Sequence, residues 1–467
     1  SDHTPLTFSI ETNSCVSEYA MTNNRIKISK QTCENRRFRY VFDQHKIPEY
    51  KEALSSLQAQ ERLFSITEEI TENKNSDAII DSAYHFLKTG LDQTFNKKFI
   101  KTVTNNFPMN SWYDEDCKNA RKTANLYAKK YDLKIDRHNN QYKMLCNEYK
   151  RIVQHKKRLH LKANRDKLLQ LDSTNQTDCW RLWNNLTRGN NTNFTNTPDI
   201  HTFHEYFTAQ VKPPQCTYFD YDHIEQMNKF ADEFKQNNSN SAMVSPLAAD
   251  ICDSRITESE VALHLKNLKN NKASGIDGIT GEFYKCITQE LITPFCTIFN
   301  YIFDRGDYPS QWAEGLINAL HKKGDSTNPD NYRKITITVA MAKIFDSILN
   351  SRLYFKNDAL SLNDPFQFGF TPSRGTTDCV FVLDTIISYQ RSKKKPTYLC
   401  FVDFTKAFDY INRNALYYKL YKQGMSHKML AIIISMFDKA KAKVQQQGEI
   451  GPPIESLFGV LQGGILS

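Results

Sequence analysis

The chain has 467 residues, of which 40% are hydrophobic and 12% aromatic, so it can fill the cores of two or three domains and is not a disordered tail. Its net charge is +9, and its eleven cysteines form neither a C-x-x-C pair nor a cluster with zinc-ligand spacing. No signal peptide opens the chain, and its longest apolar stretch, residues 429–437, is too short to cross a bilayer. These features predict an intracellular protein without membrane association, and they exclude a disulfide-rich secreted class.

Two regions precede the strongly charged part of the chain. Residues 1–10 contain an acid and an imidazole side by side, Asp2 and His3, ahead of a short strand-like run. Taken without context, such a pair indicates an ordinary polar turn. Residues 11–110 carry amphipathic stretches, as in residues 84–99, and predict a helical connecting region.

Residues 111–183 form a basic region that we expect to be helical. Between Lys118 and Lys167 there are 16 Lys and Arg against four Asp and Glu, and no Gly or Pro occurs between Ser111 and Arg188. Tyrosines interleave with the cations. The pattern indicates either a surface that binds nucleic-acid phosphates and stacks on unpaired bases, or simply a solvated charged face.

The next two regions are predicted from turn residues and hydrophobic periodicity. Residues 184–250 read as a linker with an acidic segment, because Asn, Thr and Gly dominate near its start. Thr257 and Glu260 form a capping-box pattern, and helices over 283–304 and 340–353 alternate with a short apolar strand over 315–320. Asp277 and Gly278 predict a turn. This mixture indicates an α+β fold across residues 251–396.

A possible metal ligand follows an apolar run near the C-terminus. Residues 398–402 are aromatic, aliphatic or Cys throughout, which predicts a strand buried on both faces with Asp403 at its end. Carboxylate oxygens at such a position can bind divalent cations, although a lone Asp there more often accepts hydrogen bonds from turn amides. Phe408 lies five residues further on.

Several sequence blocks in a fixed order resemble the reverse transcriptases of non-LTR retrotransposons. The blocks are Lys272–Ile279, Lys322 to Asp325, Asn331 to Ile335, Gln367 to Asp378, Phe401 to Phe408 and Gly459 to Ser467. The resemblance extends from about Ile251 to Ser467. It implies a right-hand polymerase with fingers over 251–396 and a partial palm over 397–467, preceded by the basic helical region. Asp2 and His3 resemble the last motif of the endonuclease that precedes the polymerase in this family.

The resemblance implies a role for each matching residue. Asp403 would ligate Mg²⁺, of which the intact site holds two, and Phe408 would exclude a ribose 2′-hydroxyl. Arg333, Lys322 and Lys323 would bind the triphosphate. Gln462 and Gly463 would lie against the nucleotide and the template. Arg374 and Lys272 would bind the template. The implied partners are an RNA template, a DNA primer and deoxynucleoside triphosphates, and the implied location is the nucleus. The sequence leaves the oligomeric state open.

The chain departs from the family pattern at three places. Lys334 replaces the usual proline and Leu461 replaces the usual arginine. The paired aspartates expected after Ser467 are absent, which leaves one carboxylate where two metal ions need more. We therefore expect a fragment, derived from a partial gene or a decayed copy, that is inactive as a polymerase. It either binds nucleic acid without catalysis or is an inert product.

Overall fold

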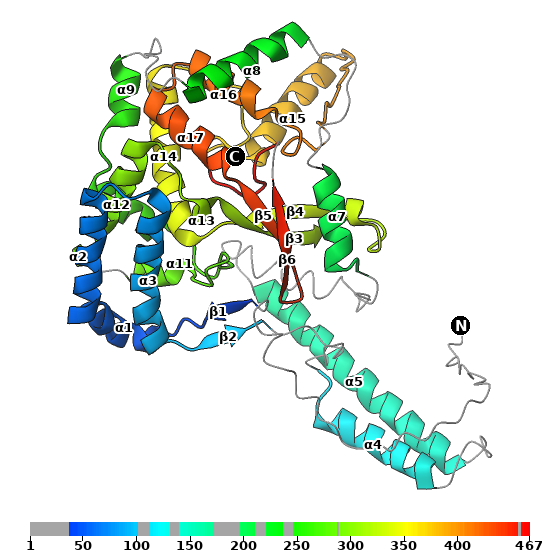
Figure 1. Cartoon of the computed structure of the whole chain (residues 1–467). Coiled ribbons are helices and arrows are strands. Elements are labelled where there is room, and N and C mark those ends of the chain that lie inside the picture. The colour runs from blue at the N-terminus through cyan, green and yellow to red at the C-terminus, as the bar shows by residue number, and fades with distance from the viewer. Residues whose placement is uncertain are drawn as a thin grey trace, which may run out of the picture.

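The computed structural model describes residues 37–100, 112–130, 140–170, 197–210, 221–236, 246–286, 289–404, 406–455 and 459–467. These residues adopt a mixed helix-and-sheet fold in which helices predominate, in agreement with the predicted α+β class (Figure 1). Asp2 and His3 lie outside the described residues, so their predicted role stays a prediction. Within the described part of the chain, no helix is both long and apolar enough to span a membrane.

A helical layer and a two-stranded ribbon form the N-terminal part. The elements are β1 (Phe38–Tyr40), the 3₁₀-helix η2 (Gln44–Lys46), α1 (Ile47–Leu54), α2 (Leu57–Thr71), α3 (Ser76–Thr94) and β2 (Lys97–Phe99). Ser56 and Asn75 accept hydrogen bonds from the first-turn amides of α2 and α3, which fixes where these helices begin. Strand β1 pairs antiparallel with β2. The predicted connecting region is therefore helical over most of residues 47–94.

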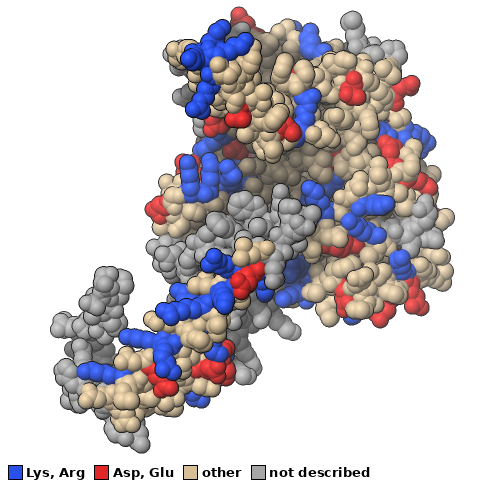
Figure 2. Space-filling view, turned by 180° about the vertical axis from the view of Figure 1, so that it is seen from behind, with Lys and Arg blue, Asp and Glu red and all other residues tan. Residues whose placement is uncertain are grey.

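Two antiparallel helices, α4 (Glu115–Lys130) and α5 (Asn140–Gln170), form the α4–α5 hairpin. The hairpin packs along its own length and projects away from the rest of the fold (Figure 1). Lys and Arg side chains lie along it (Figure 2). The prediction of helices in the basic region is confirmed for these residues.

A four-stranded sheet lies in the C-terminal part. Its strands are β3 (Glu314–His321), β4 (Tyr332–Ile337), β5 (Lys441–Gln446) and β6 (Glu449–Glu455), in the order β4-β3-β5-β6. Strand β3 pairs antiparallel with β4 and parallel with β5. Helix α7 (Ile200–Gln210) covers one face, where Phe203 and Phe207 pack with Ile317 and Val444 in a small core.

The larger core is helical. The remaining elements are α8 (Tyr221–Gln236), α9 (Pro246–Asp253), α10 (Glu258–Asn267), α11 (Gly281–Lys285), α12 (Gln289–Arg305), α13 (Ser310–Ala313), η4 (Pro329–Asn331), α14 (Ala340–Ala359), α15 (Thr376–Ser392), α16 (Arg413–Lys422) and α17 (His427–Asp438). Buried side chains of α12, α14 and α17 fill this core. The capping box of Thr257 and Glu260 at the start of α10 is confirmed, and the apolar stretch over 429–437 lies in the buried helix α17.

Part of the predicted linker is folded. Helix α7 packs on β5 and β6, and α8 packs on α16, where Phe230 contacts Tyr421 at a ring-centroid distance of 4.7 Å. The acidic segment of α8 is thus held near the C-terminal helices by apolar contacts and by the Lys235–Asp438 ion pair of 2.7 Å. The boundaries 184 and 250 themselves stay a prediction.

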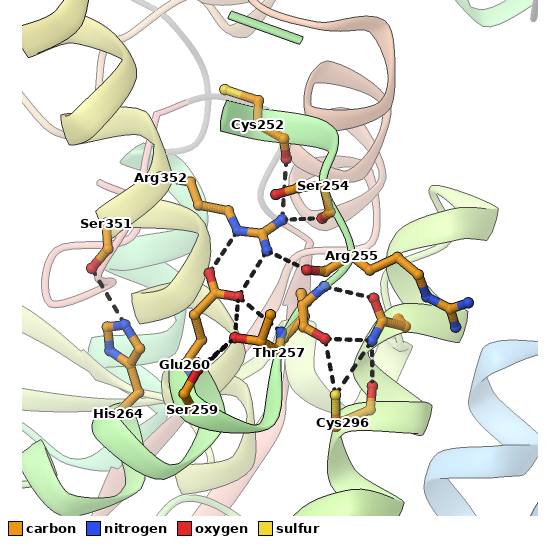
Figure 3. Close-up of polar contacts among 12 residues, drawn as sticks. Cys252, Ser254, Arg255, Thr257, Ser259, Glu260, His264, Cys296, Ser351 and Arg352 are labelled. Carbon is orange, nitrogen blue, oxygen red and sulfur yellow. Dashed lines mark hydrogen bonds and ion pairs between the residues drawn. The ribbon is translucent and has the colours of Figure 1, made fainter. Parts of the chain in front are cut away.

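The guanidinium of Arg352 joins α14 to the start of α10. It forms two hydrogen bonds with the carboxylate of Glu260, at 2.9 and 3.0 Å, and donates to the carbonyl oxygens of Cys252, Ser254 and Arg255 (Figure 3). Only 4% of Arg352 is exposed. We call these five residues the Arg352 cluster. Because a planar fork meets a carboxylate and three carbonyls, the cluster fixes the position of α10 on α14.

The prediction of a buried strand over residues 398–402 is wrong. These residues have no strand assignment, and Tyr398, Phe401 and Val402 are 91%, 80% and 78% exposed. Within the described chain no strand lies beside them to accept or donate ladder hydrogen bonds. An apolar run needs such a neighbour to become a buried strand, and its composition alone does not provide one.

Candidate functional site

Three segments far apart in the sequence meet beside β4. The amide of Val460 donates to the carbonyl of Phe408 at 2.8 Å, and the amide of Thr336 donates to the carbonyl of Gln462 at 2.8 Å. The loop that contains Gln462 and Gly463 therefore runs between the Phe408 turn and β4. The structure brings together Phe408, Gln462 and Gly463, which the sequence had assigned to one site.

Gly463 is required by the close approach of this loop to β4. Its φ is +115°, and a Cβ atom there would lie 2.7 Å from the carbonyl oxygen of Thr336. A side chain at this position would strain the backbone and push the loop away from the strand. The contact gives a physical reason for the glycine of the Gln-Gly pair, independent of any resemblance.

A small cavity of about 30 Å³ lies between β4, α7 and the Gln462 loop. Lys334 and Asp409 line it and form an ion pair of 2.7 Å, with 20% and 16% of their side chains exposed. Such a volume holds about one water molecule and no nucleotide. Lys334, noted in the sequence only as a departure, thus neutralises an acid that the sequence analysis had not assigned.

The predicted phosphate-binding residues share the tip of the β3–β4 hairpin. Arg333 pairs in register with Leu320, and the amide of Lys322 donates to the carbonyl of Asn331 at 2.7 Å. Side chains alternate along strands, so Arg333 and Lys322 lie on one face, opposite to Lys334. Arg333, Lys322 and Lys323 are exposed, and none has an ion-pair partner among the described residues. Their positive charges are therefore available to bind an anion.

Tyr206, Asp330 and Lys406 form a polar cluster beside this tip. Tyr206 donates its hydroxyl to Asp330, and Lys406 lies 3.5 Å from the same carboxylate. The hydrogen bond from Tyr206 holds the pKa of Asp330 below its usual range. Sequence reasoning missed these residues, since Tyr206 lies on a helix more than 100 positions away and no local signal relates it to Asp330.

Asp403 is exposed in an irregular segment. Among the described residues, no group of three or more His, Cys, Asp or Glu side chains is arranged to hold a metal ion. The described residues therefore do not bring two further carboxylates to Asp403. A pair of divalent ions does not fit this donor set.

Phe370 and Arg374 belong to a loop that reaches the Phe408 turn. The Phe370 and Phe408 rings meet edge to face at 6.3 Å, and Phe370 is 92% exposed. Arg374 donates to the carbonyl of Pro365 and lies 5.6 Å from the Phe368 ring centroid. In this arrangement Arg374 stabilises its own loop, and it is not among the residues that line the Lys272 cavity.

A second cavity, of about 400 Å³, contains Lys272. Lys269 and Lys343 also line it, together with Gly463. None of these three lysines has an ion-pair partner within 4 Å in the described chain. Burial lowers the pKa of Lys343, while Asp277 and Asp346 act in the opposite direction. The structure thus places Lys272 and Gly463 at one basic cavity that opens next to the Gln462 loop.

Two buried carboxyl groups lie behind this cavity. Burial raises the pKa of Asp277 and of Asp346 to about 7 in each case. The hydroxyl of Tyr308 donates to Asp346 at 3.0 Å, and the amide of Ile279 donates to Asp277 at 3.2 Å. Asp277 occupies the turn that the sequence predicted, in which Gly278 has a φ of +75°.

Comparison with known proteins shows which family this chain resembles. Residues 320–467, about a third of the chain, match the family model described as reverse transcriptase (RNA-dependent DNA polymerase). The chain is 28% identical over 209 residues to a probable RNA-directed DNA polymerase from transposon X-element of Drosophila melanogaster, covering 44% of this chain and 23% of that protein.

Two other relatives are also proteins of mobile elements. The RNA-directed DNA polymerase from mobile element jockey of Drosophila melanogaster is 25% identical over 223 residues, which cover 48% of this chain and 24% of that protein. The retrovirus-related Pol polyprotein from a type-1 retrotransposable element R2 of Popillia japonica is 30% identical over 170 residues, covering 36% and 22%. The chain spans about a quarter of the length of these relatives.

Proposed function

Because the chain carries a reverse transcriptase region related to those of non-LTR retrotransposons, we propose that it is part of an RNA-directed DNA polymerase. The whole protein would extend a DNA primer along an RNA template with deoxynucleoside triphosphates. The observation that carries this proposal is the agreement between the family match over 320–467 and the meeting of Phe408, Gln462 and Gly463 beside β4. The right-hand arrangement of fingers and palm belongs to the same proposal.

Within this proposal the basic tip of the β3–β4 hairpin binds the triphosphate. Arg333 offers a planar fork and Lys322 a compact charge on the same face, and phosphate oxygens accept from both. Lys323 adds a third exposed cation. Phe408 would lie beneath the sugar, and the loop of Gln462 would contact the nucleotide and the template strand.

Reverse transcriptases use divalent metal ions, and we assign Asp403 as one ligand for Mg²⁺ in the whole protein. The described residues do not complete a two-ion site, so no catalytic step is derived from this chain alone. The remaining carboxylates would come from the rest of the polymerase. On this basis we expect the 467-residue chain to lack polymerase activity.

Primer extension tests the proposal directly. We expect no extension by this chain and clear extension by a version completed downstream of Ser467. In the completed version, Asp403→Asn should lower extension by at least about a hundredfold, because a metal ligand is lost. Asp384→Asn, at an exposed position on α15, is the matched control and should have no effect.

Three outcomes would count against the proposal. Failure of the completed protein to extend any primer would contradict a polymerase. Extension by the 467-residue chain itself would mean that the carboxylates needed for metal binding had been misidentified. Full activity of the Asp403→Asn version would remove Asp403 from the metal site.

A second candidate function is nucleic-acid binding without catalysis. The specific observation in its favour is that the described residues around Asp403 form no metal-binding group, whereas cations without ion-pair partners occupy the β3–β4 tip and the Lys272 cavity. It predicts that this chain binds an RNA–DNA template-primer and protects it, while the completed version binds equally well and still does not extend it. Binding and extension measured on the same preparation separate the two functions.

A further inference from the structure

The α4–α5 hairpin has one face that holds the two helices together. The hydroxyl groups of Tyr113 and Tyr149 lie 3.2 Å apart, and the Lys156 ammonium forms ion pairs with Asp114 and Asp116. Partly buried residues of α5 recur on this side at three- and four-residue spacing, as Tyr149, Ile152 and Lys156 do. This face is therefore occupied within the protein.

The opposite face of α5 is a row of exposed cations. Six of them define what we call the basic face of α5: Lys143, Lys150, Arg151, Arg158, Lys162 and Arg165. At 100° per residue these positions centre about half a turn away from Tyr149 and Lys156. From Lys143 to Arg165 the row spans roughly 33 Å at 1.5 Å per residue.

None of these six cations has an ion-pair partner within 4 Å in the described structure. Lys118 and Lys156 are the cations of the hairpin that have ion pairs among the described residues, and neither belongs to the basic face. Glu148 and Asp166 are the acids of α5, and both lie at one flank of the row. Figure 2 shows the hairpin projecting with its Lys and Arg side chains exposed. Six unpaired cations repel one another, so an anionic partner lowers the free energy of the hairpin.

The described tyrosines of the hairpin do not offer stacking platforms on the basic face. The sequence suggested that they interleave with the cations, but Tyr113 and Tyr149 bond to each other between the helices, and Tyr142 is partly buried. Among the described hairpin residues no Tyr, Trp or Phe side chain is exposed beside the basic face. This favours contact with a phosphate backbone over stacking on unpaired bases.

We propose that the basic face of α5 binds the phosphate backbone of a double-stranded nucleic acid, apart from the polymerase region. A row of roughly 33 Å matches one turn of a duplex, about 34 Å. The contact needs neither the Lys272 cavity nor the β3–β4 tip. It goes beyond the proposed function, since it holds whether or not the whole protein polymerises DNA.

The test compares two fourfold variants of the full 467-residue chain. Arg151→Gln, Arg158→Gln, Lys162→Gln and Arg165→Gln neutralise the basic face, while Lys51→Gln, Lys229→Gln, Lys285→Gln and Lys419→Gln remove the same charge from other exposed sites. Fluorescence anisotropy with a 30-base-pair duplex of arbitrary sequence measures affinity across salt concentrations. Circular dichroism verifies that both variants keep their helices.

We expect the basic-face variant to bind the duplex at least about tenfold more weakly near 0.1 M salt. Its slope of log affinity against log salt should fall by about 3 to 4, since each phosphate contact contributes about 0.9. The control variant should lose much less affinity for the duplex. Duplex DNA, duplex RNA and an RNA–DNA hybrid, run as separate arms, identify the preferred duplex.

Three results would overturn the inference. Wild-type affinity in the basic-face variant would make this face an ordinary solvated surface. An equal loss in the control variant would reduce the effect to net charge. Tighter binding of a single strand of the same length, abolished by the basic-face variant, would replace duplex binding by single-strand binding.

Discussion

Asp346 is a residue whose protonation is set by its surroundings. It is 5% exposed in the middle of α14, and burial raises the pKa of its carboxyl group to about 7. Between about pH 4 and pH 7 the folded protein therefore keeps a proton that the unfolded chain releases. Stability from this group is complete below about pH 4 and is lost as the pH rises through 7. Asp277 behaves in the same direction.

Asp346→Asn should flatten the pH dependence of stability. An amide at this position still accepts the hydrogen bond from Tyr308, and it has no proton to lose. Between pH 5 and pH 7 the free energy of unfolding of the wild type should fall more steeply than that of the variant, by about 1.4 kcal/mol per pH unit. Urea unfolding at several pH values measures this difference. Asp358→Asn, exposed on the same helix, is the control, and parallel curves for Asp346→Asn and wild type would refute the assignment.

At the scale of elements, the Arg352 cluster determines how α10 meets α14. Five hydrogen bonds from one guanidinium reach the capping-box acid Glu260 and three carbonyl groups of the preceding turn. The same carboxylate also receives the amide of Thr257 at 2.9 Å. The cluster therefore connects a helix cap to a tertiary contact, so one substitution affects both.

Arg352→Lys should destabilise the protein by roughly 3 kcal/mol. A lysine keeps the charge but loses the planar fork, and it leaves buried carbonyls and part of the Glu260 carboxylate without donors. Arg255→Lys is the matched control, because the side chain of Arg255 points away from the cluster and only its carbonyl takes part (Figure 3). Urea unfolding of both variants provides the comparison. A change below about 1 kcal/mol for Arg352→Lys would mean that the cluster adds little.

Elements whose signal is local could be predicted from the sequence. The pattern of Thr257 and Glu260 predicted the start of α10, because a capping box involves only four consecutive residues. The turn at Asp277 could be predicted because it depends only on the glycine that follows. Strand β5 escaped notice because its residues 441–446 are mostly polar, and its partners β3 and β6 decide its conformation. The strand predicted over 398–402 failed for the converse reason. Its composition favours a strand, but the described chain offers it no neighbour.

In the candidate site, too, local features could be predicted from the sequence and contacts between distant segments could not. Gly463 could be assigned from the motif, and the contact with Thr336 explains why glycine is needed there. The pairing of Lys334 with Asp409, and of Tyr206 with Asp330, depends on packing between segments that are distant in sequence. Such pairs have no periodicity or spacing from which they could be inferred.

Taken as a whole molecule, the chain buries its apolar residues unevenly. Helices α12, α14 and α17 share a dense core, whereas α15 has no buried residue and the segment after it is exposed. Phe381, Phe401 and Phe404 are 71%, 80% and 79% exposed. Figure 1 shows α15 at the periphery of the fold, away from the N-terminal helices. Exposed apolar side chains on α15 and in the segment after it favour association.

Because of these exposed side chains, the purified chain should self-associate as its concentration rises. Phe381→Ser together with Phe401→Ser should lower the association constant at least about tenfold, since burying one such ring is worth roughly 1.5–3 kcal/mol. Thermal stability should stay the same, because both rings are already in contact with water in the monomer. Sedimentation velocity over a concentration series measures association, and Leu57→Ser with Phe64→Ser on α2, 74% and 66% exposed, is the matched control. A monomeric wild type at high concentration, or an equal effect of the control pair, would show that the exposed face of residues 376–404 does not drive association.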